Sequence, residues 1–388
     1  MRPYGPFGYS RKQLIPILAV FAIVSFLAFL RWRQVANVQP ATSGSTVLVL
    51  DDCDSDYKNP PFEDAVKTFG RHAELMKTVA DLNICQTVGG CRALAVSPDG
   101  SFFVVCENVG DRLTAYETQT GKKLWSIAGK FTSAGISTLG MTYALMNEGT
   151  IYGKGVVILD RAGRIIRKGD VGGFDIVLDA DRQALWLVGA DIKKCNLDLE
   201  VRMTCGPIGW CAVSVDVDGD GCIWVAERFH PDVKGSKDRL LRISPKGEIQ
   251  KTVDLDWSPL GVRVDRIDGS VWATGCRARK NPLSNLPGKL DGIHLGWIAG
   301  GWLRNLLQRG RADEVTQRYD RQGTRLLEMK RGGNSIEIDP ADRTIWIAGQ
   351  KKLWHYTARG EKLGGYGALS SSQKWVAVAP ATQETASK

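Results

Sequence analysis

Histidine is scarce in this chain, and the cysteines lack the spacings of metal sites. The 388 residues include 4 histidines and 9 cysteines. No C-x-x-C pair and no C-x-x-C-H segment occurs, which leaves little support for a zinc or haem site. A glycine-rich phosphate loop and a Ser–His–Asp order are missing as well. We therefore expect no resident cofactor.

Long hydrophobic runs are missing after residue 30, which excludes a multi-span membrane protein. The one run, Leu14–Leu30, has 17 residues without a charge and lies at the short end of what spans a bilayer. Arg11 and Lys12 precede it and Arg31–Arg33 follows it, as is typical of headgroup anchoring. A cleaved signal peptide would show small residues at that second boundary. Residues 1–34 are therefore predicted to be a single-pass membrane anchor, with the body of the chain extracytoplasmic.

The net positive charge of the chain comes from two segments. The net charge is +9, and residues 1–33 carry five basic and no acidic side chains. Residues 277–331 carry a further +7, so the rest of the chain is slightly acidic. Because the excess is local and no recognition motif accompanies it, we expect no nucleic-acid partner.

Internal repetition is the strongest signal in the sequence. The 43 glycines and 12 tryptophans favour a β-rich fold with many tight turns. Five segments share an apolar strand, a turn with Asp and often Gly, and a second strand with a central aromatic residue. They are residues 94–106, 176–188, 213–226, 261–273 and 335–348. A second hairpin with a glycine at one fixed place follows in the units, as at Gly121, Gly163, Gly247, Gly323 and Gly360.

Four short strands in about 40 residues, repeated along the chain, predict an all-β fold, the β-propeller. We count six blades over residues 91–380, at 91–129, 130–172, 173–209, 210–257, 258–331 and 332–368, with an insertion at 277–315. The alternative is seven blades, in which Lys374–Val378 pairs with Val47–Leu50. Residues 35–90 are predicted to be a tether with a strand at Thr46–Leu50 and a short helix at Phe62–Leu82, and residues 381–388 a tail.

The V-D-x-D-G-x-x-W-V-A hairpin, matched best by residues 213–226, is similar to the NHL-type and related six-bladed propellers. The resemblance covers about residues 91–368. It implies a ligand or partner surface at one end of the ring. Such propellers include binding modules, scaffolds, lyases and lactonases, so the resemblance specifies the fold and not the function.

The segment Asp216-Val-Asp218-Gly-Asp220-Gly221 followed by Glu227 has the spacing of a Ca²⁺ loop. Because other blades repeat the turn without the extra acids and no helix flanks it, we expect an ordinary hairpin turn. Ca²⁺ or another divalent metal held by Asp216, Asp218 and Asp220 is the alternative. Two cysteine pairs, Cys195 with Cys205 and Cys211 with Cys222, are candidate disulfides because each flanks a turn.

Loops that join second to third strands lie on one face of a propeller and are candidate binding loops. Their residues of interest are Glu107, Asn108, Glu227, Arg228, His230, Arg277, Arg279 and Lys280. The insertion adds His294, and its apolar residues, Trp297 and Trp302 among them, lie near helical spacing. This pattern fits a lid over the channel, a docking surface for another protein, an interface with lipid headgroups, or a helix packed on its own propeller.

We therefore expect a membrane-anchored binding or scaffold module that takes a protein, glycan or small ligand. The alternative is a propeller lyase or hydrolase that uses His230 and Glu227, with or without a divalent metal.

Overall fold

The computed structural model describes residues 45–51, 65–79, 93–107, 111–146, 154–206, 212–229, 237–277, 313–349, 351–369 and 374–380. The chain divides into two units, residues 1–43 and 44–388, and all the described residues lie in the second. The predicted anchor at residues 14–30 therefore lies outside the described residues. Among those that are described, no helix is long and apolar enough to cross a membrane.

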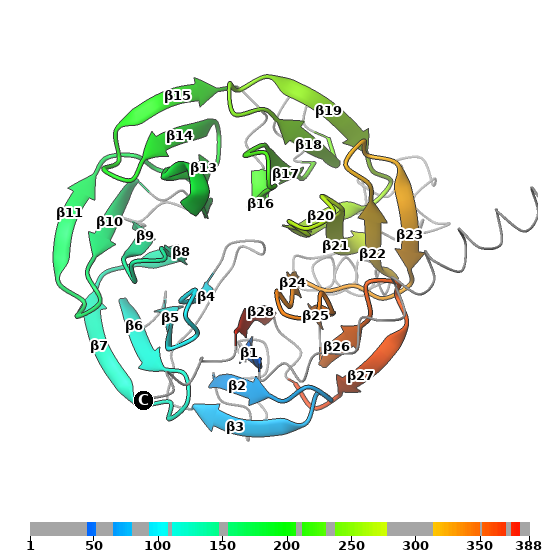
Figure 1. Ribbon diagram of the computed structural model, residues 1–388, viewed down its shortest axis with the longest axis horizontal. Helices are drawn as coiled ribbons and strands as arrows, with labels where there is room; N and C mark the ends of the chain where they lie inside the picture. The colour runs from blue at the N-terminus through cyan, green and yellow to red at the C-terminus, as the bar shows by residue number, and fades with distance from the viewer. Residues whose placement is uncertain are drawn as a thin grey trace, which may run out of the picture. The chain divides into compact units, whose positions relative to one another are not determined.

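In the part of the chain that the structure describes, seven four-stranded antiparallel sheets form a ring, and each is a blade with its first strand innermost (Figure 1). Blade A is β28 (Lys374–Ala379), β1 (Thr46–Asp51), β2 (Ala65–Phe69) and β3 (Leu75–Val79). Blade B is β4 (Leu94–Val96), β5 (Phe102–Glu107), β6 (Arg112–Glu117) and β7 (Lys123–Ala128). Blade C is β8 (Phe131–Ile136), β9 (Thr142–Met146), β10 (Gly155–Leu159) and β11 (Ile165–Gly169). Blade D is β12 (Asp175–Asp179), β13 (Ala184–Val188), β14 (Ile192–Asn196) and β15 (Val201–Cys205), with a 3₁₀ turn at Ala180–Arg182.

The three remaining blades follow the same order. Blade E is β16 (Ala212–Val217), β17 (Ile223–Glu227), β18 (Arg239–Ile243) and β19 (Ile249–Asp254). Blade F is β20 (Ser258–Val264), β21 (Val271–Arg277), β22 (Asp313–Tyr319) and β23 (Arg325–Met329). Blade G is β24 (Ser335–Ile338), β25 (Ile345–Gly349), β26 (Lys352–Tyr356) and β27 (Lys362–Tyr366). The fold is a β-propeller, as predicted.

The expectation of six blades is wrong, and the seven-bladed alternative is confirmed. The two ends of the propeller build the seventh sheet together, because β28 pairs with β1 from Thr46↔Ala379 to Asp51↔Lys374. A blade that combines the last strand with the first three closes the ring and leaves no open sheet edge between the ends of the chain.

The helix expected at Phe62–Leu82 is also wrong, since the described part of this segment is the hairpin of β2 and β3. A tight turn joins the two strands, with the Gly70 amide donating to the Glu74 carbonyl oxygen at 3.0 Å. Ala73 holds a φ of 61° at the place where all other blades except blade D have glycine. The turn therefore lacks the residue that marks it elsewhere, and pairing with β1 overrides the helical spacing.

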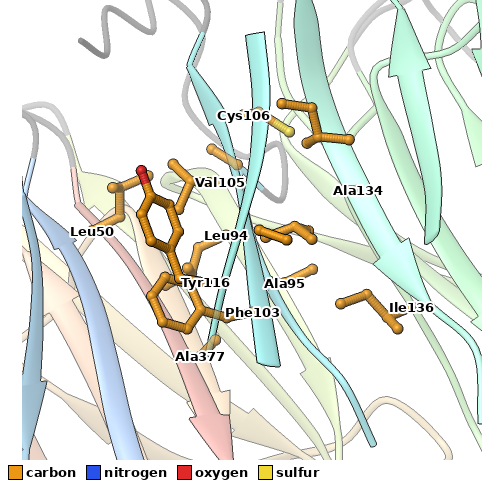
Figure 2. Close-up of a cluster of buried hydrophobic side chains, with 14 of the residues drawn as sticks. Leu50, Leu94, Ala95, Phe103, Val105, Cys106, Tyr116, Ala134, Ile136 and Ala377 are labelled. Atoms are coloured by element: carbon orange, nitrogen blue, oxygen red, sulfur yellow. The ribbon is translucent and has the colours of Figure 1, made fainter. Parts of the chain in front are cut away.

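Aromatic residues of the second and third strands pack between blades. Phe103 and Tyr116 lie stacked with ring centroids 5.3 Å apart. Figure 2 shows them beside Leu50 of blade A, with Ala134 and Ile136 of blade C on the far side of β5. Each sheet thus buries both faces against its neighbours, which is why no blade is stable by itself.

The fixed glycine of the second hairpin is required by the fit between blades. Gly163 holds a φ of +78°, and a Cβ there would lie 2.6 Å from Cγ of Trp125 on the outer strand of blade B. Blade D reverses the arrangement, because Leu199 takes the left-handed position with a φ of 66°. The outer strand that faces it carries Gly169, where a Cβ would lie 2.9 Å from Leu199 Cδ1. Every such contact therefore needs one residue without a side chain.

We expect Gly163→Ala to lower the free energy of unfolding by about 1 kcal/mol or more, because alanine disfavours this φ and would clash with Trp125. Gly367→Ala is the matched control, since nothing lies within 4 Å of a Cβ there. Denaturant unfolding of both variants measures the difference. Equal stability of the two variants would show that the contact between blades does not require glycine.

Candidate ligand-binding site

One position on each innermost strand faces a central cavity. The cavity has a volume of about 340 Å³, and residues from all seven inner strands line it. The position lies opposite the middle of the second strand, as in the pairs Val177↔Trp186 and Arg263↔Trp272. Its seven residues, here called the channel ring, are Ala377, Ala95, Gly135, Val177, Asp216, Arg263 and Glu337.

The channel ring has two unlike sides. Four consecutive blades contribute small apolar residues from β28, β4, β8 and β12. Because these side chains are small, they do not fill the cavity. The next three blades contribute Asp216, Arg263 and Glu337 from β16, β20 and β24. A charged wall therefore faces an apolar wall across the channel. Figure 1 shows the strands that carry the charged residues, β16, β20 and β24, across the ring from β4 and β8.

Arg263 lies at the centre of the charged wall. Its Nε donates to Glu337 Oε2 at 2.9 Å, and its Nη1 donates to the Val262 carbonyl oxygen at 2.7 Å. Burial alone would lower the pKa of Arg263, but the charges of Glu337 and Asp216 outweigh burial and raise this pKa above its ordinary value. The guanidinium is therefore a permanent buried cation.

Side chains of the inner strands also join one blade to the next. The Val264 amide of β20 donates to Asp216 Oδ2 of β16 at 2.9 Å. The Val215 amide of β16 donates to Asp175 Oδ2 of β12 at 3.2 Å. These hydrogen bonds fix the strands β16 and β20, which carry two residues of the charged wall, so these charges are held in fixed positions.

The cavity opens at the face that carries the turns between first and second strands, because Pro98, Thr138, Ala180 and Arg266 of these turns line it. This face is opposite the one that carries the loops between second and third strands. The sequence-based candidates on the loops between second and third strands therefore lie, where described, away from the cavity. Asp216 lines the cavity, and Asp218 and Asp220 lie in a turn at the same face without lining it.

Glu107 and Glu227 end the second strands of blades B and E, and both are fully buried. Glu107 accepts hydrogen bonds from Arg112 Nε at 2.9 Å and from the Thr114 hydroxyl at 2.6 Å. Glu227 accepts one from Arg239 Nε at 2.5 Å. Burial raises the pKa of Glu227, although the hydrogen bond and charge of Arg239 act in the opposite direction. Neither carboxylate is presented to solvent.

Arg277 pairs at 3.0 Å with Asp256, which lies in the connection before blade F, and at 3.4 Å with Glu328 of its own blade. Arg228 follows Glu227 at the same face and is exposed. The other candidates lie outside the described residues: Asn108, His230, Arg279, Lys280, His294, Trp297 and Trp302.

The three acids of the Ca²⁺-like spacing are separated by the fold. Asp216 belongs to the channel ring, whereas Asp218 lies in the hairpin turn and pairs with Arg242 at 2.7 Å. Asp220 pairs with Arg321 of the neighbouring blade, and this interaction lowers the pKa of Asp220. Within the described ranges, no group of three or more His, Cys, Asp or Glu residues could hold a metal ion.

The candidate disulfide between Cys195 and Cys205 is not formed, since both thiols are free. The register explains this, because Cys195 lies opposite Val201 and Cys205 lies opposite Ile192. Cys222 is free and buried, and Cys211 lies outside the described residues.

Sequence reasoning missed the channel ring because it looked for function in loops. The repeats do carry a signal for the ring, at the position two residues before the turn residues Asp218, Asp265 and Asp339. There the blades change from small apolar residues to Asp216, Arg263 and Glu337. A charge at a position that is apolar in the other repeats therefore marks the charged side of the channel ring.

No family model matches the chain, and no curated protein matches it. Solved structures with the same fold include hydrazine synthase of Kuenenia stuttgartiensis, at 16% identity over 70% of this chain and 78% of that one, with a TM-score of 0.53. A functionally unknown protein from Desulfotomaculum acetoxidans aligns at 11% identity over 86% and 98% of the two chains, with a TM-score of 0.57. At these identities the comparisons show the β-propeller fold and nothing finer.

Proposed function

We propose that this protein is a binding module without catalytic activity of its own, and that it takes a small ligand in the central channel. The observation that carries the proposal is the cavity of about 340 Å³ with a charged and an apolar wall. Its volume falls in the range of small-molecule sites, and a few fixed polar groups in an apolar setting are what such sites use.

The alternative chemistry of a lyase or hydrolase has less support. It needs Glu227 to reach a substrate, but this side chain is fully buried and paired with Arg239. Its partner in that hypothesis, His230, lies outside the described residues. We also propose that a protein or glycan binds at the face that carries the loops between second and third strands. Arg228 and the insertion at 277–315 are the candidate contacts.

Attachment to a membrane completes the proposal. The uncharged run Leu14–Leu30 and its basic flanks support a single-pass anchor, with the propeller outside the cytoplasm. Such a protein would hold its binding channel close to a membrane surface.

Mass spectrometry of bound small molecules tests the channel. The full chain is purified from its native membranes without added ligand and denatured, and the released compounds are identified. We expect a small molecule with the wild type and none with Ala95→Phe, which fills the apolar wall. Ala162→Phe, the same change on an exposed turn, is the control and should retain the ligand. Equal release from Ala95→Phe and the wild type would contradict a channel site.

Cell fractionation tests the anchor. We expect the full chain to stay with membranes after alkaline washing and a chain without residues 1–33 to be found in the soluble fraction, because the apolar run is then gone. Amino-terminal sequencing of the full chain should begin before residue 14. A mature chain that begins after residue 33 would establish a cleaved signal peptide instead.

A further inference from the structure

The third strand of blade G carries a histidine at the position where three other blades carry a permanent cation. His355 of β26 lies opposite Trp346 of β25, and the two rings are stacked with their centroids 3.8 Å apart. His355 is buried, with 2% of its surface exposed. We propose that this histidine makes the contact between blade G and the closing blade A sensitive to pH, so that acid weakens the contact. The inference is independent of the channel site.

In blades D, E and F the residue opposite the central tryptophan is a lysine or an arginine, and two of these cations are bonded to the next blade. Lys194 Nζ lies 5.2 Å from the centroid of the Trp186 ring and donates to the Pro245 carbonyl oxygen at 3.3 Å. Arg318 Nη1 donates to the Ala358 carbonyl oxygen at 2.9 Å. Both acceptors lie in a turn of the following blade, two residues before its glycine. The three pairs are Trp186↔Lys194, Trp224↔Arg242 and Trp272↔Arg318.

His355 lacks the hydrogen bond that its equivalents make. The corresponding acceptor in blade A is the carbonyl of Arg71, two residues before Ala73. An imidazole is shorter than a lysine or arginine side chain, and neither ring nitrogen of His355 makes a hydrogen bond with the described residues. A protonated His355 would therefore be a buried charge without a partner, which is costly.

The residues around His355 belong to the contact between blades G and A. Trp346 packs in one hydrophobic cluster with Phe69 of blade A. The β2–β3 turn of blade A lies against Gly364, the residue opposite His355 on β27, because a Cβ there would lie 3.0 Å from the His72 carbonyl oxygen. A charge on His355 would thus arise where the closing blade packs on its neighbour.

Burial lowers the pKa of His355 from its ordinary value of 6.5 to about 4. The positive charges of Arg71 and His72 in the β2–β3 turn act in the same direction. Asp342 in the β24–β25 turn and the Arg71 backbone act in the opposite direction without outweighing burial. At neutral pH His355 is therefore uncharged and packs as an aromatic side chain.

The contact is most stable above pH 6.5 and loses stability as the pH falls towards 4, because the open form binds the proton more tightly than the closed form. Asp339 of blade G also titrates at this contact, where it accepts a hydrogen bond from the Ser45 hydroxyl at 3.2 Å. Burial raises the pKa of Asp339, so acid favours the closed form there. A loss of stability between pH 7.5 and 5.5 therefore has the sign of His355 and not that of Asp339.

Hydrogen exchange of the full chain, followed by mass spectrometry of its peptides, tests the proposal. After correction for the intrinsic rate, we expect the amides of β26, β27 and the β2–β3 hairpin to exchange about tenfold faster at pH 5.5 than at pH 7.5, the ratio that the two pKa values of His355 give. The amides of blade D should show no such change, because Lys194 is charged at both pH values.

His355→Phe keeps a flat ring on Trp346 and removes the titrating group, so exchange at this contact should then be the same at both pH values. His72→Phe, the same change at an exposed residue of the adjacent turn, is the control and should keep the pH dependence of the wild type.

Equal exchange of these amides at the two pH values in the wild type would overturn the proposal, and so would an acid response that persists in His355→Phe. An increase spread evenly over all blades would also contradict it, because the whole propeller and not this contact would then be opening. Since the first comparison uses the wild type alone, the test does not depend on whether a variant folds.

Discussion

The pairing of β28 with β1 is the contact on which the rest of the molecule depends. It joins residues near the two ends of the propeller in one sheet, from Thr46↔Ala379 to Asp51↔Lys374. Trp375 and Val376 of β28 are almost completely buried, so the strand is an integral part of the hydrophobic core. Because every blade needs two neighbours to bury its faces, closure by this sheet supports each of the other six.

The same closure creates the candidate site. Ala377 of β28 completes the channel ring, and its small side chain belongs to the apolar wall that faces Arg263 and Glu337. The charged residues follow one another on β16, β20 and β24, and hydrogen bonds such as Val264 to Asp216 hold these strands together. Scaffold and site are therefore built from the same strands, and the repeated fold becomes specific through the few positions where the repeats differ.

The sequence predicted blades B to G well because their turns are marked. Glycines such as Gly163 and Gly247 are required there by positive φ and by the outer strand of the preceding blade, so the pattern repeats for a physical reason. Blade A was predicted only as the alternative, because its inner strand comes from the opposite end of the propeller and because Ala73 takes the place of that glycine in a segment with helical spacing. The charges at Asp216, Arg263 and Glu337 could be seen in the sequence, but their convergence depends on ring closure, which local patterns do not encode.

The most direct test of the closed ring compares the unfolding of a chain that ends at residue 380 with that of a chain that ends at residue 373. The first keeps β28, and the second lacks it and exposes β1 as a free edge. We predict that the first unfolds cooperatively with the stability of the full chain, and that the second loses its cooperative transition. Identical unfolding curves for the two chains would contradict a propeller closed by its terminal strands.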